Sequence, residues 1–273
     1  MGTIDFLPLV KAYPALSKTY GEVSCVAGVE ITSEGPRWIR LYPVPFRSLE
    51  ETQQFAKFQP IRVTAAPHSG DRRPETRRPV RDSIEVTGTV IPTADGWRQR
   101  RRFVEPLMVE SMCEVLRRQR ADNTSLAVFR PKQVLDIVIE SADVNEGKRA
   151  IARAWAAQTS LLDGLGSEER RHQLRELEFV PWTFKYHYVC SDRGCKTHKQ
   201  SIIDWEIVGS YRKVRNRSDW REKLKERWLN ELCSSDRDTA FFVGNQHQHP
   251  ASFLVLGVWW PPRQADQLVI SGL

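Results

Sequence analysis

Residues 23–31 read VSCVAGVEI and residues 38–42 read WIRLY. The first run is rich in β-branched and small residues, and the second alternates between bulky amphipathic and aliphatic residues, as a half-buried strand does. The stretch Ser33-Glu34-Gly35-Pro36 between them has the composition of a hairpin loop. Pro43 ends the second run, because proline cannot donate to a strand ladder. We therefore expect a β-hairpin over residues 23–42.

The same patterns divide the rest of the chain into two parts. Strand-like runs recur at 61–65, 83–91, 125–129 and 134–139, interrupted by a helix that begins near Pro106. Later strand-like runs at 179–190, 239–243 and 252–260 alternate with helical patterns, two of them between residues 146 and 178. The predicted fold class is α+β, with a β-rich domain over residues 1–143 and an α+β domain over residues 144–273.

Composition indicates a basic protein. Lys and Arg outnumber Asp and Glu by 41 to 34, which gives a formal net charge of +7. A basic surface attracts polyanions, so nucleic acid is the expected partner. No apolar run approaches the roughly 20 residues that a spanning helix needs, so no membrane partner is expected. The five cysteines form no evident disulfide framework, and no secretory signal is recognisable, so we expect a cytoplasmic protein.

A cluster of metal-ligating residue types lies between a strand-like run and a possible helix. Cys190, Cys195 and His198 have the spacing Cys-x4-Cys-x2-His, and thiolate and imidazole are the ligands that zinc prefers. The scattered Cys25 and Cys113 are interpreted instead as small buried hydrophobic residues. We expect bound zinc, with a structural role favoured over a catalytic one, while an iron–sulfur cluster would need more cysteines than this segment holds.

The sequence leaves the fourth ligand of this cluster open. His187 is nearest, although the period of two places it opposite Cys190 on the strand, so the chain would have to bend there. The alternatives lie further along the chain: Cys233, the pair His247 and His249, and the carboxylates Asp204 and Glu206.

Carboxylates and histidines supply the candidate catalytic groups. Asp204 and Glu206 flank a tryptophan, and His247 and His249 follow an apolar strand-like run. Two carboxylates on one face could bind Mg²⁺ or act as acid and base. If these groups meet the cysteine–histidine cluster, a metal-dependent nuclease or other phosphodiester hydrolase becomes the alternative function.

Two arginine runs supply the candidate nucleic-acid contacts. The phosphate-binding candidates are Arg72, Arg73, Arg77, Arg78, Arg100, Arg101 and Arg102. Trp97, Trp38 and Tyr42 are aromatic side chains that could stack on bases. Arginines beside aromatic rings are typical of single-strand binding, with charges on phosphates and rings on bases.

Three stretches carry a resemblance to a known family: Leu9–Lys18, Val23–Gly28 and Trp38–Pro43. They resemble the opening of the dual OB-containing domains of uncharacterised bacterial proteins. This chain departs from that pattern by having two residues between Arg40 and Pro43. The resemblance implies an OB-like barrel in residues 1–143 that binds nucleic acid or oligosaccharide on its face. It implies no catalytic residue.

The leading hypothesis is therefore a cytoplasmic, zinc-containing nucleic-acid-binding protein, with a role in a bacterial defence assembly as one setting. The hydrolase is the alternative. A third interpretation is an interaction subunit that has neither turnover nor affinity for nucleic acid.

Overall fold

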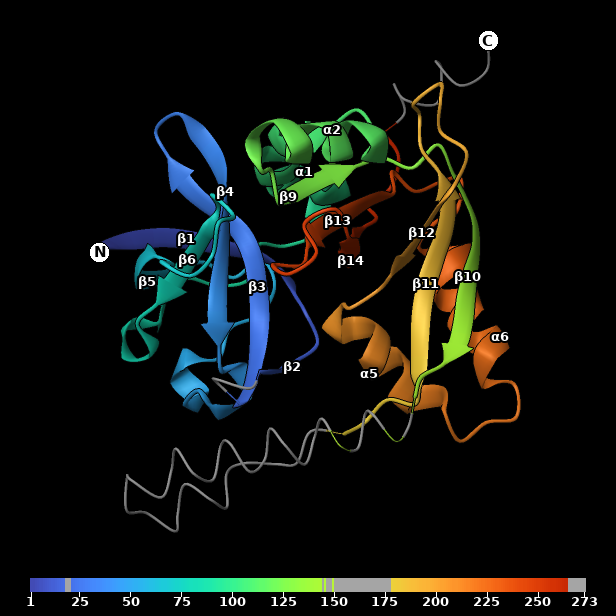
Figure 1. Cartoon of the computed structure of the whole chain (residues 1–273), viewed down its shortest axis with the longest axis horizontal. Helices are drawn as coiled ribbons and strands as arrows, with labels where there is room; N and C mark the ends of the chain where they lie inside the picture. The colour runs from blue at the N-terminus through green and yellow to red at the C-terminus, as the bar shows by residue number, and fades with distance from the viewer. Residues whose placement is uncertain (18–20, 144, 146–148, 150–177, 265–273) are drawn as a thin grey trace.

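The computed structural model describes residues 1–17, 21–143, 145, 149 and 178–264 (Figure 1). The helices expected between residues 146 and 178 fall almost entirely outside these residues. The described chain forms an N-terminal and a C-terminal β-rich body. Helices α1 (Ala94–Val104) and α2 (Met112–Asp122) lie in the segment that connects the two bodies, and further helices lie between the later strands. The α+β fold class and the barrel-like N-terminal part are thereby confirmed.

The N-terminal body is a closed β-barrel. Its strands are β1 (Gly2–Lys11), β3 (Gly21–Thr32), β4 (Gly35–Val44), β5 (Ile61–Pro67) and β6 (Thr76–Pro79). They pair in the order β1-β3-β4-β6-β5, and β5 closes the barrel by pairing with β1. Short strands β2 (Ala15–Ser17) and β7 (Glu85–Val86) and the 3-10 turns η1 (Phe46–Ser48), η2 (Glu51–Gln53) and η3 (Arg81–Ser83) complete it.

The register of the barrel follows from the alternation in the sequence. β3 and β4 form the expected antiparallel hairpin, with Gly28 opposite Ile39, while β4 and β6 are parallel. Ile39 and Leu41 fill the barrel interior, whereas Arg40 between them lies on the outer face. These five strands close a barrel in which β4 and β6 form the one parallel pair.

The connection between the two bodies contains α1 (Ala94–Val104), η4 (Glu105–Leu107), β8 (Met108–Val109) and α2 (Met112–Asp122). The helix expected near Pro106 begins instead at Met112, and Pro106 lies in the 3-10 turn η4. Ser111 explains the later start, because its hydroxyl accepts a hydrogen bond from Glu114 N at 3.1 Å and so caps α2.

The C-terminal strands repeat the connectivity of the first barrel. They are β9 (Leu126–Phe129), β10 (Gln133–Ser141), β11 (Trp182–Val189), β12 (His198–Ser201), β13 (Ala240–Asn245) and β14 (Phe253–Trp259). β10 pairs with β11, β11 with β12, β14 with β13 and β13 with β9. A parallel bridge from Ile202 to Val255 joins the end of β12 to β14. If β9 and β10 are counted as one interrupted strand, the five C-terminal strands pair in the same cyclic order as the five strands of the first barrel.

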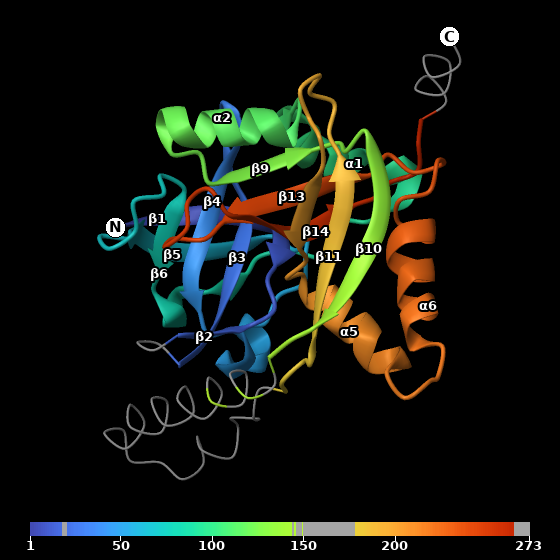
Figure 2. The ribbon, with the colours of Figure 1, turned by 45° about the vertical axis from the view of Figure 1, so that its right-hand side comes forward.

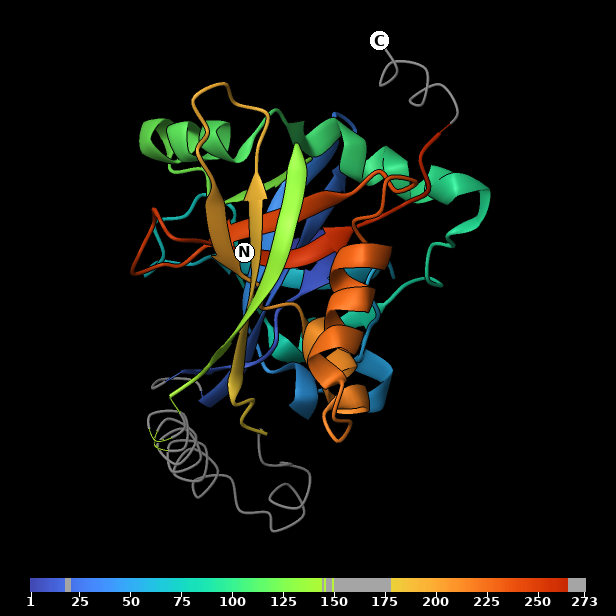
Figure 3. The ribbon, with the colours of Figure 1, turned by 90° about the vertical axis from the view of Figure 1, so that its right-hand side faces the viewer.

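Helices α5 (Trp205–Val214) and α6 (Trp220–Lys225) and the π-helical turn η5 (Glu226–Glu231) lie between β12 and β13. They pack against the sheet of β10, β11 and β12 (Figure 3). The residues at steps of four, Trp220, Leu224, Trp228 and Leu232, are all buried, as their spacing predicts.

One side of the first barrel, formed by β1, β3 and β4, is covered by the second body. A shared core joins Leu7, Val29 and Ala27 to Val128, Phe242 and Leu256, and β13 and β14 lie against β1 and β3 (Figure 2). Trp38 meets Phe242 edge-on, with ring centroids 6.2 Å apart. A β-carbon at Gly244 would lie 3.1 Å from Arg40 Nη2, so glycine allows the two bodies to approach this closely.

Candidate functional site

Four side chains that can ligate a metal ion lie together beside the first turn of α2: Cys113, Cys190, Cys195 and His198. Their ligand atoms all lie within 4.8 Å of one another. Cys190 Sγ is 3.6 Å from Cys113 Sγ and 3.5 Å from His198 Nε2. The ligands of a tetrahedral ion, at metal distances of about 2.0–2.3 Å, lie about 3.3–3.8 Å apart. The cluster could therefore hold a metal ion with four protein ligands.

The local structure brings these ligands together from two elements. Cys190 follows β11 and His198 begins β12, and the ladder sets Tyr188 opposite His198. The loop between the two strands is tied to the start of α2, because Ser191 Oγ donates to Glu110 O at 2.6 Å and Arg117 pairs with Asp192 at 2.8 Å. A bound ion would therefore cross-link α2 to the β11–β12 hairpin.

Cys113 is the ligand that sequence reasoning missed. It was expected to be a small buried hydrophobic residue, and its place in the metal-ligating group corrects that expectation. It lies 77 residues before Cys190, so no spacing motif connects the two. The only signal for it in the sequence was a cysteine–histidine cluster that lacked one ligand.

Metal binding at this cluster would displace protons from its thiols. Burial and contact with Cys190 raise the pKa of Cys113 to about 12, and burial raises the pKa of Cys195. Burial lowers the pKa of His198, which keeps its imidazole neutral and able to ligate. Metal ligation needs thiolates, which repel one another at these distances, and a divalent cation removes that repulsion.

The other expected fourth ligands lie elsewhere. His187 is not in the metal-ligating group, because it is an odd number of residues from Cys190 and so lies on the opposite face of β11. Cys233 Sγ lies 3.5 Å from Trp228 O, and His247 Nδ1 lies 3.2 Å from Asp71 Oδ1. His249 is exposed in the loop between β13 and β14.

Asp204 and Glu206 are brought together, but with a lysine. Lys57 Nζ lies 2.8 and 2.9 Å from the two Asp204 carboxylate oxygens and 3.0 Å from Glu206 Oε1. Burial opposes the charge of Lys57, but the two carboxylates outweigh it and hold its pKa above the ordinary value. Asp204 also caps α5 by accepting from Glu206 N. The carboxylates and the histidine that a metal-dependent hydrolase would need, Asp204, Glu206 and His247, thus lie outside the cysteine–histidine cluster.

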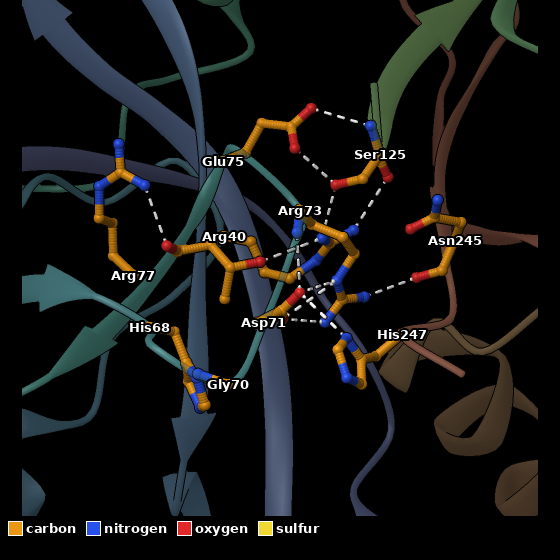
Figure 4. Close-up of polar contacts among 11 residues, drawn as sticks. Arg40, His68, Gly70, Asp71, Arg73, Glu75, Arg77, Ser125, Asn245 and His247 are labelled. Atoms are coloured by element: carbon orange, nitrogen blue, oxygen red, sulfur yellow. Dashed lines mark hydrogen bonds and ion pairs between the residues drawn. The ribbon is translucent and has the colours of Figure 1, made fainter. Parts of the chain in front are cut away.

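The first arginine run is divided between the loop that joins β5 to β6, where Arg72 and Arg73 lie beside the second body, and β6 itself, which contains Arg77 and Arg78 (Figure 4). Arg73 pairs with Asp71 at 2.6 Å and donates to Asn245 O at 2.8 Å. Burial acts to raise the pKa of Asp71, but the hydrogen bonds from Arg73 outweigh it and hold that pKa well below its usual range. Arg73 therefore fixes this loop to the second body.

The remaining arginines of that run have different surroundings. Arg77 donates to the carbonyl oxygens of Pro74 and Thr76, whereas Arg72 and Arg78 are exposed. Arg40 is buried nearby and donates to Ser125 Oγ at 2.7 Å and Ser125 O at 2.9 Å (Figure 4).

The second arginine run lies on α1 and is divided between core and surface. Trp97 is 8 % exposed and packs edge-on against Trp259, so it has no face available for a base. Arg101 is 3 % exposed and pairs with Asp238 and Glu105. Arg100 is half-buried, with its guanidinium over the Phe58 ring, while Arg102 is exposed.

A further set of basic side chains was not expected from the sequence. Lys185 and His187 on β11 lie opposite Ser201 and Lys199 on β12, on the face that points away from the core. Lys199 is exposed, and Lys185 is half-buried and pairs with Glu140 at 2.6 Å. Arg193 and Lys196, both exposed, extend this basic strip onto the loop that holds the cysteines. Figure 3 shows this sheet from its outer side.

Comparison with known families covers both bodies. A family model described as Domain of unknown function (DUF8757) matches residues 108–271. The chain belongs to this family. A second model, Domain of unknown function (DUF8758), matches residues 3–106. The two matches meet near residue 107, whereas the sequence predicts a boundary near residue 143. A DUF8757 unit that begins at residue 108 includes Cys113 and β9, so it contains all four candidate ligands and the β9–β13 pairing.

No curated protein matches the chain. Among the described residues, no helix is long and apolar enough to cross a membrane.

Proposed function

We propose that the protein binds single-stranded nucleic acid on the outer face of β11 and β12, and that zinc in the Cys113–Cys190–Cys195–His198 group holds the adjoining loop. One observation carries the proposal: β11 and β12 take the second and third places in a strand order that matches the first barrel, and they carry the basic strip. In OB-type barrels, the second and third strands form the face that binds oligonucleotides. The corresponding face of the first barrel is covered by β13 and β14.

Zinc is the metal that suits this ligand set. Three thiolates and one imidazole are a recurrent structural zinc combination, and four protein ligands leave no position for a substrate. Zinc binding requires reduced thiols, and all five cysteines are free, so a reducing cytoplasm is part of the proposal. The hydrolase alternative has no comparable support, because Asp204, Glu206 and His247 lie outside the cluster.

Removing the two lysines that the strands contribute to the strip, Lys185 and Lys199, tests the binding face. We expect Lys185→Ala/Lys199→Ala to weaken binding of a labelled oligothymidylate, because each lysine lost removes a phosphate contact that releases counterions. For two contacts, the slope of log affinity against log salt should become shallower by about 1.4. Fluorescence anisotropy over a salt series measures this slope.

The matched control is Lys213→Ala/Lys223→Ala, which removes the same charge from exposed positions on α5 and α6. Its slope should stay at the wild-type value. Wild-type binding that does not depend on salt, or equal slopes in the two double variants, would show that the strip is not the binding face.

A further inference from the structure

A cavity of about 470 Å³ opens where β1, α1, α5 and β14 meet. Its wall includes Lys11, Lys57, Arg100 and Glu206 together with aromatic side chains. Ligand cavities in proteins span about 300–1,000 Å³. The space is therefore sufficient for a small organic ligand, and it lies apart from both the cysteine cluster and the β11–β12 face.

Two of the cations in this wall, Lys11 and Arg100, form no ion pair at contact distance with a carboxylate among the described residues. Lys11 Nζ donates to Phe55 O at 2.9 Å, and Arg100 Nε donates to Ile91 O at 2.7 Å. An ammonium has three N–H donors and a guanidinium has five, so both retain donors for a ligand. Lys57 differs, because its three donors face three carboxylate oxygens of Asp204 and Glu206.

The surroundings of these cations make their charge costly. Burial and the neighbouring Lys57 lower the pKa of Lys11 to about 8, although Glu206 and Asp204 act to raise it. Burial likewise lowers the pKa of Arg100 and outweighs the opposite effect of Glu206. The nearby carboxylates thus do not fully compensate the cost of burying these charges, and a bound anion in contact with them would reduce that cost. The site therefore favours a ligand that carries negative charge.

The rest of the wall favours a planar ring. Phe58, Trp97, Trp205 and Trp260 all line the cavity. Trp97 and Phe58 are almost fully buried, whereas Trp205 and Trp260 are partly exposed. Aromatic side chains beside cations bind ligands that combine a flat ring with an anionic group.

We propose that this cavity binds a nucleoside phosphate, with Lys11 and Arg100 on the phosphate and the base against the exposed part of Trp205 or Trp260. Glu206, 61 % exposed, can accept a hydrogen bond from the sugar. The inference goes beyond the proposed function, because the cavity would bind a nucleotide whether or not the β11–β12 face binds strands.

Calorimetric titration with AMP tests the inference. Wild-type protein should bind AMP saturably. Adenosine, which lacks the phosphate, and inorganic phosphate, which lacks the base, should each bind at least about tenfold more weakly. Lys11→Met and Arg100→Met should each weaken AMP binding about tenfold or more. Lys223→Met, on the surface of α6, is the control and should bind as the wild type does.

Lys11→Arg and Arg100→Lys keep the charge and should restore much of the AMP affinity, which separates a lost contact from a misfolded variant. Absence of saturable AMP binding by the wild type would overturn the inference, as would unchanged affinity in both methionine variants. Lys185→Ala/Lys199→Ala should bind AMP normally, so failure of the strand-binding proposal leaves this test intact.

A second titration identifies the source of the ligand. If a 5′-phosphorylated oligonucleotide competes with AMP and its 5′-hydroxyl form does not, the cavity holds the end of a strand. If neither competes, the cavity holds a free nucleotide. Both results support nucleoside phosphate binding, whereas equal competition by the two oligonucleotides would argue against a phosphate contact at Lys11 and Arg100.

Discussion

Cys113→Ser is expected to remove the metal from the protein and to lower its stability strongly. The wild type should contain one zinc per chain, and the variant well below one, because serine replaces one of four ligands. An ion present at about 1,000 times its dissociation constant contributes about 4 kcal/mol to folding, and most of this should be lost. Elemental analysis and thermal unfolding with and without a chelator measure the two effects.

Two variants serve as controls for this result. Cys25→Ser changes a half-buried cysteine of β3 that lies outside the cluster, and His187→Ala removes the ligand candidate nearest in sequence. Both should retain one zinc per chain. Full zinc content in Cys113→Ser, or loss of zinc in His187→Ala, would contradict the ligand assignment.

The metal group illustrates what local sequence can predict. Cys190, Cys195 and His198 lie within nine residues of one another, so their spacing alone identifies them. Cys113 joins them only because Ser111 starts α2 at a particular residue and the hairpin loop binds that first turn. Those contacts are tertiary, and the sequence holds no periodicity that reports them.

The basic residues also show what the sequence alone does not predict. A run of arginines indicates charge, but not which members face a neighbouring acid. Arg101 and Arg73 are held by Asp238 and Asp71, while the lysines of β11 and β12 form a strip that no sequence run displays. The period of two along β11 is enough to place Lys185 and His187 on one face, once residues 182–189 are known to form a strand.

Asp238→Ala is expected to destabilise the protein by about 3–5 kcal/mol, because it leaves buried positive charge without its partner. Asp238 is 5 % exposed, and its carboxylate lies 2.6 Å from Arg130 Nε and 3.1 Å from Arg101 Nη1. Asp238 follows the π-helical turn and Arg101 belongs to α1, so the pair joins the connecting segment to the second body. Denaturant unfolding followed by tryptophan fluorescence measures the loss.

The pH dependence of the difference in unfolding free energy between the wild type and Asp238→Ala provides an independent test. Burial acts to raise the pKa of Asp238, but hydrogen bonds and charge from Arg130 and Arg101 outweigh it and hold the pKa below the ordinary 3.8. A carboxyl with a depressed pKa stabilises the fold above its unfolded pKa, and this stabilisation is lost as pH falls through the folded pKa. The difference between wild type and Asp238→Ala should therefore be constant above about pH 5 and shrink below pH 4.

Asp5→Ala is the matched control, since Asp5 and its partner Arg62 are 58 % and 50 % exposed. Loss of an exposed pair should change stability by at most about 1 kcal/mol. If Asp238→Ala were no more destabilising than Asp5→Ala, Arg101 would not depend on this acid for its burial.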